Sequence, residues 1–136
     1  MERKTKHFRK RDAILTCVRE TTVHPSADWV YARLKPDISD LSLGTVYRNL
    51  SLFKEQGLIT SLGTVKGVER FDGNTDPHVH FICNGCGSVL DLMQVELPQA
   101  LTAAATTACG GQIQSCQLTF TGLCSDCQNE NLEEAI

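Results

Sequence analysis

The most constraining feature of this sequence is a pair of Cys-x-x-Cys motifs, Cys83-x-x-Cys86 and Cys124-x-x-Cys127, separated by a stretch long enough to fold. Each motif lets two thiolates reach one ion, and two such motifs are typical of a four-thiolate zinc site. Because four ligands fill the tetrahedron, we expect a structural zinc, bound with ~10–16 kcal/mol in peptide models. The predicted ligands are Cys83, Cys86, Cys124 and Cys127.

Two other interpretations of these motifs are less consistent with the chain. Disulfides are rare in cytoplasmic proteins. A thioredoxin-like redox pair opens a helix after a strand, whereas here the first motif ends a predicted strand and a second motif is present. The remaining thiols, Cys17, Cys109 and Cys116, are predicted to be small buried apolar groups.

Charge divides the chain of 136 residues into two halves. All 13 Lys and Arg residues lie within residues 1–70, whereas 8 of the 16 acidic residues lie within 71–136. This asymmetry predicts two units with different partners, the basic one suited to a polyanion such as DNA. No apolar run approaches the roughly 18 residues needed to cross a bilayer, and no secretory signal follows the basic start, so we expect a cytoplasmic protein.

The first half has the pattern of three short helices. An apolar stripe runs over about residues 8–19, and a second helix is predicted to begin after the N-cap residue Ser26. A third helix is predicted to begin after Ser42 and to stop near Gly57.

Two alternating segments, 58–62 and 68–71, follow the third helix and are predicted to form a β-hairpin joined through Gly63 and Gly67. Three helices and a hairpin indicate a winged helix-turn-helix.

Side chains off the apolar stripe of the third helix are candidates for reading DNA. Arg and Asn pair with guanine and adenine edges, and Thr45 and Arg48 share one helix face. Basic residues of the N-terminal arm would contact phosphates. The alternative is an amphipathic helix with a solvated polar face. The candidate DNA contacts are Thr45, Tyr47, Arg48, Asn49, Lys6, Arg9 and Arg11, although Tyr47 also suits the core.

A second group of ligand-type residues lies between the halves. His78 and His80 are two apart on a predicted strand, so both imidazoles face the same side, with their Cα atoms about 6.6 Å apart. A predicted hairpin at residues 85–87 brings Asp91 near them, and Asp72 is close in sequence. Imidazole and carboxylate without thiolate suit Fe(II), Mn(II) or Zn(II). The alternative is two solvated surface histidines.

These motifs together resemble those of the ferric uptake regulator (Fur) family, over about residues 8–128. The residues that carry the resemblance are His24-Pro25-Ser26-Ala27, residues 42–50 (SLGTVYRNL), Arg70-Phe71-Asp72, Pro77-His78-Val79-His80, the two cysteine motifs and Asp91. The resemblance implies an α+β chain: an N-terminal winged helix-turn-helix domain (1–71), a hinge (72–77) and a small α/β dimerisation domain (78–136) with a structural zinc site. It also implies a homodimeric, metal-responsive repressor.

Individual positions resemble the peroxide-sensing (PerR-type) branch of that family. Iron-sensing members usually have Glu where Asp91 stands and His where Cys116 stands, and zinc-sensing members tend to have Cys where Asp72 stands. The resemblance implies that Fe(II) or Mn(II) binds His24, Asp72, His78, His80 and Asp91.

In this interpretation one cation joins the two domains and closes the dimer on a palindromic DNA operator. With Fe(II), the resemblance implies that hydrogen peroxide oxidises His24 or His78 and releases the DNA. Three alternatives remain: an iron-responsive or other metal-uptake repressor without peroxide sensing, a zinc-stabilised DNA binder that senses nothing, and a non-haem iron enzyme, since two His and a carboxylate form its facial triad. A chain of this length leaves little room for a substrate pocket, so we predict that the protein is not an enzyme.

Overall fold

The computed structural model describes residues 2–76 and 78–134, and the side chains of residues 8–76 and 78–129. It divides into two compact units, residues 1–75 and 76–136, which are described separately below. The division falls inside the predicted hinge, whose last residue, Pro77, lies outside the described residues. Among the described helices, none combines the length and apolar character that a bilayer crossing requires.

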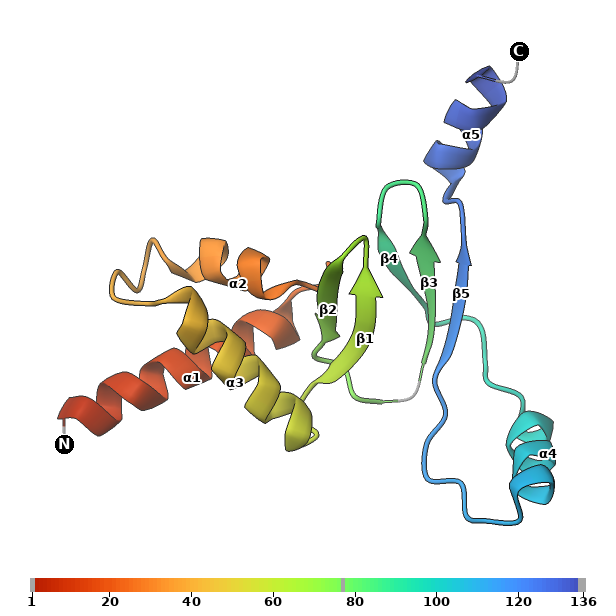
Figure 1. The fold of residues 1–136 in the computed structure, drawn as a ribbon, viewed down its shortest axis with the longest axis horizontal. Helices are drawn as coiled ribbons and strands as arrows, with labels where there is room; N and C mark the ends of the chain where they lie inside the picture. Colours follow the sequence, from red (N-terminus) through yellow and green to blue (C-terminus); the bar gives the residue numbers. More distant parts are fainter. Residues whose placement is uncertain (1, 77, 135–136) are drawn as a thin grey trace. The chain divides into compact units, whose positions relative to one another are not determined.

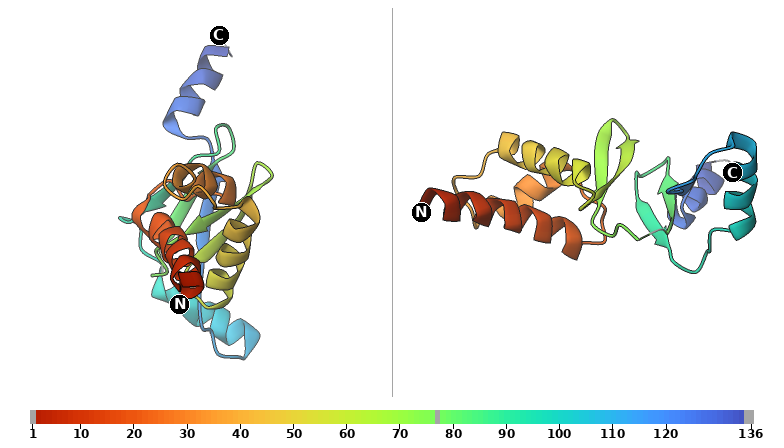
Figure 2. Two further views of the ribbon diagram at one scale, coloured as in Figure 1. Left: turned by 90° about the vertical axis from the view of Figure 1, so that its left-hand side faces the viewer. Right: turned by 90° about the horizontal axis from the view of Figure 1, so that it is seen from below.

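Three helices form the body of the first unit, α1 (Glu2–Glu20), α2 (Ala27–Leu34) and α3 (Leu43–Glu55), and they pack against one another (Figures 1 and 2). The caps were predictable because they are local: Ser26 Oγ accepts from Trp29 N at 3.1 Å, and Ser42 Oγ accepts from Thr45 N at 3.1 Å. Helix α1 is longer than the predicted 8–19, since it continues through the basic arm. Fully buried core residues include Ile14, Val30, Val46, Leu50 and Phe53.

A hairpin of β1 (Thr60–Val65) and β2 (Val68–Asp72) completes this unit and makes it a winged helix (Figure 1). The sequence placed Gly63 in the turn, which is wrong. Gly63 lies within β1 at a shift of register, where its φ of +81° suits a bulge. The turn is made by Lys66 and Gly67, both with positive φ, as two-residue hairpin turns require.

The second unit has a three-stranded sheet with the order β4-β3-β5. Strands β3 (Val79–Cys83) and β4 (Val89–Leu92) are antiparallel, and β5 (Leu118–Gly122) runs parallel to β3. The apolar residues Ile113, Leu118 and Phe120 predict a strand over residues 112–120, and the observed strand starts later than that. A strand exists only where it has a partner, and the first residue of β3, Val79, pairs with Leu118.

Two helices complete this unit, α4 (Gln99–Cys109) before β5 and α5 (Ser125–Glu134) after it (Figure 1). The sequence predicts an Ala-rich helix that Gly110-Gly111 ends, and Gly110 does end α4 in the left-handed conformation. No residue of α4 is buried, so the prediction that Cys109 is buried is wrong; Cys17 and Cys116 are partly exposed. The mixed α+β fold is confirmed.

Candidate metal centres and nucleic-acid interface

The four cysteines of the two motifs converge in the second unit. Cys83 ends β3 and Cys86 follows in the turn, while Cys124 and Cys127 lie after β5 and at the start of α5. All four sulfur atoms lie within 4.8 Å of one another, and Cys86 Sγ is 3.8 Å from Cys124 Sγ. A Zn–S length of about 2.3 Å in a tetrahedron puts sulfur pairs about 3.8 Å apart. The donor set therefore fits zinc.

Backbone amides stabilise the thiolate form of a cysteine in this cluster. The N–H groups of Cys124 and Cys86 donate to Cys83 Sγ at 3.3 and 3.4 Å, and these bonds lower the pKa of Cys83 to about 6. Hydrogen bonds with Ser88 lower the pKa of Cys86. The contact between Cys86 Sγ and the Ser88 hydroxyl, at 2.9 Å, has the largest effect. The neighbouring sulfurs raise the pKa of Cys127 to about 12. A divalent cation is the charge that would favour thiolate at all four positions.

The turn of the first motif depends on Gly85. A Cβ atom built there would lie 2.8 Å from Cys127 Sγ and 3.1 Å from Cys127 Cβ. A side chain at residue 85 would therefore push the two motifs apart. The absence of a Cβ at this position lets the two motifs approach without this crowding.

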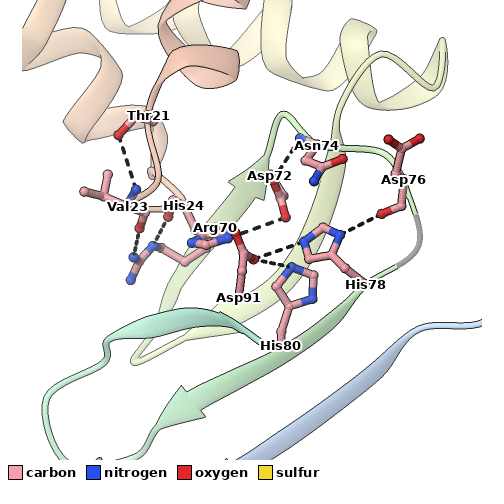
Figure 3. Close-up of polar contacts among 10 residues, drawn as sticks. All are labelled: Thr21, Val23, His24, Arg70, Asp72, Asn74, Asp76, His78, His80 and Asp91. Atoms are coloured by element: carbon pink, nitrogen blue, oxygen red, sulfur yellow. Dashed lines mark hydrogen bonds and ion pairs between the residues drawn. The ribbon is translucent and has the colours of Figure 1, made fainter. Parts of the chain in front are cut away.

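The second unit also carries a C-terminal ligand cluster, which we define as His78, His80 and Asp91 (Figure 3). His80 pairs with Asp91 across β3 and β4, as the predicted hairpin required. His78 Nε2 and His80 Nε2 lie 3.0 and 3.3 Å from Asp91 Oδ1, and the two ring centroids are 4.2 Å apart. Two imidazole nitrogens and one carboxylate oxygen thus face a common point, which is a donor set for Fe(II) or Mn(II).

The orientation of the His78 ring is set by the backbone. His78 Nδ1 lies 2.6 Å from the carbonyl oxygen of Asp76, so Nδ1 carries the proton and donates it (Figure 3). With a cation bound at the cluster, Nε2 would offer its lone pair on the side of Asp91. The sequence could not predict this contact, because its acceptor is a backbone carbonyl, which any residue at position 76 would provide.

The first unit carries an N-terminal ligand pair, which we define as His24 and Asp72. His24 lies between α1 and α2, and Asp72 ends β2. His24 Nε2 is 3.5 Å from Asp72 Oδ2, while Asp72 Oδ1 accepts from Asn74 N at 2.9 Å (Figure 3). The carboxylate is thereby held by the backbone on one oxygen and faces the imidazole with the other.

The surface of α3 presents part of the predicted DNA-reading set. Tyr47 is 49% exposed, and Arg48 is exposed, with its Nη2 donating to Thr45 Oγ1 at 3.1 Å. Asn49 does not share this face. It is 8% exposed, and its amide donates to the Thr45 carbonyl at 2.8 Å within the helix.

The basic arm is described only in part. Arg9 is exposed, whereas the guanidinium of Arg11 lies 5.3 Å from the ring centroid of Phe53 and 3.2 Å from Asp12 Oδ1. The side chain of Lys6 lies outside the described residues. Arg9 is thus the exposed side chain, and Arg11 the partly buried one, of the two predicted arm residues whose side chains are described.

A winged helix followed by a unit with four converging cysteines and a His/Asp cluster defines a metal-binding transcriptional regulator. The family model of the ferric uptake regulator family matches residues 2–121, so the chain belongs to that family. It is 32% identical over 121 residues to the peroxide-responsive repressor PerR of Staphylococcus aureus, covering 89% of this chain and 81% of that protein. Family members and PerR are transcriptional regulators and not enzymes.

Solved structures share the fold. The peroxide stress regulator of Campylobacter jejuni matches with a TM-score of 0.80 and 23% identity, covering 93% of this chain and 94% of that one. The ferric uptake regulator of Francisella tularensis, solved with iron, matches with a TM-score of 0.70 and 25% identity, covering 87% and 90%. Fur-family regulators are DNA-binding dimers.

Proposed function

We propose that this protein is a metal-dependent, peroxide-responsive repressor that binds a palindromic DNA operator as a homodimer in the cytoplasm. The observation that carries the proposal is the presence of oriented His and Asp donors in both units: the N-terminal ligand pair in one and the C-terminal ligand cluster in the other. Similarity to PerR over most of the chain supports it.

In this proposal His24 and Asp72 bind the same divalent cation as His78, His80 and Asp91. The first pair offers two donors and the cluster offers three, and neither alone fills the coordination sphere of Fe(II) or Mn(II). Nitrogen and oxygen donors without thiolate separate this regulatory centre from the structural zinc at the four cysteines.

Shared ligands would couple metal binding to DNA binding. A cation that binds one arrangement of the two units better than others shifts the population toward it. Typical coupling free energies are ~1–3 kcal/mol, and DNA must then tighten metal binding by the same factor. The favoured arrangement is the one in which both α3 helices of the dimer match the two half-sites.

Peroxide sensing would follow from the loss of a ligand. When bound, ferrous iron would supply the electrons that reduce hydrogen peroxide beside its ligands. His24 and His78 are the imidazoles proposed to gain oxygen, and an oxidised ring no longer offers the same nitrogen donor. Loss of either ring leaves one unit with fewer ligands, so the DNA-binding arrangement is no longer favoured.

DNA recognition is proposed to rest on Thr45, Tyr47 and Arg48 of α3. The exposure of Tyr47 and Arg48, and the hydrogen bond from Arg48 to Thr45, support this assignment. Arg9, with Arg11 and Lys6, would contact phosphates and add salt-dependent affinity. The buried Asn49 would act by holding the helix and not by touching a base.

The test is binding of the zinc-loaded protein to duplex DNA selected from a random pool in the presence of Mn(II). We expect Mn(II) to tighten binding, and His24→Ala and His80→Ala each to abolish that effect. Asp28→Asn, an exposed acid on α2, serves as the control. DNA binding that is equally tight without Mn(II) would contradict the proposal. Binding released by iron removal but unaffected by peroxide would identify an iron-responsive repressor instead.

A further inference from the structure

The backbone at His24 adopts a conformation that a non-glycine residue rarely takes. Its φ is +55°, in the left-handed region, and the next residue is Pro25, which offers no N–H. Such a conformation persists only where surrounding contacts hold it. The direction of the His24 imidazole depends on this backbone, so the contacts that fix it also place the ring.

Arg70 supplies two of these contacts. Its Nε donates to the carbonyl of His24, and its Nη2 donates to the carbonyl of Val23 at 2.6 Å (Figure 3). The planar guanidinium can bridge two neighbouring carbonyls at once, whereas an ammonium is a single point charge. The strand adds a third contact, since Phe71 N donates to the Pro25 carbonyl at 2.9 Å.

The same strand face carries the partner of His24. Arg70 and Asp72 are two apart in β2, so their side chains point to the same side of the hairpin. Asp72 Oδ2 lies 3.5 Å from His24 Nε2. One strand face thus holds the backbone of His24 through Arg70 and faces its ring with Asp72.

We propose that Arg70 is a positioning residue of the regulatory metal centre, because it holds the left-handed backbone at His24 and so keeps the imidazole beside Asp72. The inference rests on the proposed function for the identity of the centre. It assigns Arg70 no contact with the cation. Any effect of Arg70 on metal affinity should therefore arise only through the position of His24.

The metal test compares Arg70→Ala and Arg70→Lys with Arg33→Ala, an exposed arginine on α2, in the full-length zinc-loaded protein. Mn(II) affinity is measured from the electron paramagnetic resonance signal of free Mn(II). We expect Arg70→Ala to weaken Mn(II) binding by about 10- to 100-fold, as loss of outer contacts to a ligand does. Arg70→Lys should fall between it and the parent, and Arg33→Ala should match the parent.

A double-mutant cycle shows whether Arg70 acts through His24. In the His24→Ala background, Arg70→Ala should cause no further loss of Mn(II) affinity. An equal loss in both backgrounds, or parental affinity for Arg70→Ala, would overturn the inference. A purely structural role would predict the equal loss.

A second readout needs no metal. Amide hydrogen exchange at His24 and Ser26 should accelerate in Arg70→Ala and not in Arg33→Ala, with the zinc content unchanged. Unchanged exchange overturns the role of Arg70 whatever the Mn(II) affinities are. If His24→Ala alone binds Mn(II) like the parent, the proposed ligand set fails, and the exchange result still decides whether Arg70 holds this segment.

Discussion

His78, the residue just before β3, has its Nε2 atom 3.0 Å from Oδ1 of Asp91 on β4. His80 Nε2 lies 3.3 Å from the same oxygen. One carboxylate oxygen thus faces two imidazoles on the same side of a rigid sheet. Because strands position side chains more precisely than loops do, His80 and Asp91 are preorganised for a cation.

Asp91→Asn should weaken Mn(II) binding by roughly tenfold or more, since the cluster loses its only negative charge. Zinc content should not change, because no cysteine is affected. Isothermal titration of the zinc-loaded protein with Mn(II) measures this, with Asp37→Asn, an exposed acid after α2, as the control. Equal Mn(II) affinity in Asp91→Asn and the parent would exclude Asp91 as a ligand.

Gly85→Ala should impair the zinc site. The added Cβ would lie 2.8 Å from Cys127 Sγ, a separation that requires the motifs to move apart. We expect faster zinc release to a chelator and a lower melting temperature of the second unit. Gly111→Ala is the control, because its Cβ meets only Cys109 Sγ at 3.7 Å and the backbone is not left-handed. Identical zinc release from both variants would show that the cluster tolerates a wider turn.

Gly73→Ala should displace the end of β2. Its Cβ would lie 2.6 Å from Arg19 Cα and 2.8 Å from the Val18 carbonyl oxygen, and neither backbone atom can move aside cheaply. The expected results are lower stability of the first unit and weaker Mn(II) binding through Asp72. Thermal unfolding and Mn(II) titration test both, with the exposed Thr75→Ala as control. Parental values in both measurements would mean that the contact is relieved without shifting Asp72.

Glu69 makes a small pH-dependent contribution to the stability of the wing. The Ser61 hydroxyl donates to Glu69 Oε2 at 2.7 Å and Lys54 Nζ lies 3.2 Å away, and both lower the pKa of Glu69, Ser61 more strongly. A carboxyl with a lowered folded-state pKa stabilises above its unfolded pKa, and that stabilisation is lost as pH falls through the folded value. Because the pair is exposed, the effect should be modest.

Glu69→Gln should therefore be less stable than the parent near pH 7, and the difference should shrink as pH falls below the ordinary pKa of a glutamate carboxyl. Thermal unfolding at a series of pH values measures it. Ser61→Ala should show part of the same trend, since it removes one of the two stabilising contacts. A difference that stays constant with pH would assign the loss to packing and not to charge.

Local signals in the sequence predicted much of the fold. Ser26 and Ser42 cap their helices, and Gly110 ends α4, because caps depend on a few neighbouring residues. The four-cysteine cluster followed from spacing alone. The start of β5 could not be predicted, because it depends on the length of β3, which lies 35 residues or more away in sequence.

The sequence contained a signal that Asn49 is buried, and the prediction of a base contact did not use it. Val46, Asn49, Leu50 and Phe53 follow the spacing i, i+3, i+4, i+7 of a buried helix face, and all four are buried. Residue type suggested a base contact, but position along the helix places the side chain inside. The role of Arg70, in contrast, depends on two backbone carbonyls, which no residue pattern records.

The central claim is that side chains of both units bind one exchangeable cation that controls DNA affinity. Its most direct test is DNA affinity of the Fe(II)- and Mn(II)-loaded protein before and after hydrogen peroxide, with peptide mass spectrometry of the same samples. The account predicts tight binding with either metal, loss of binding only for the Fe(II) protein, and added oxygen at His24 or His78. Loss of DNA binding with both histidines unmodified, or equal DNA affinity with and without metal, would contradict it.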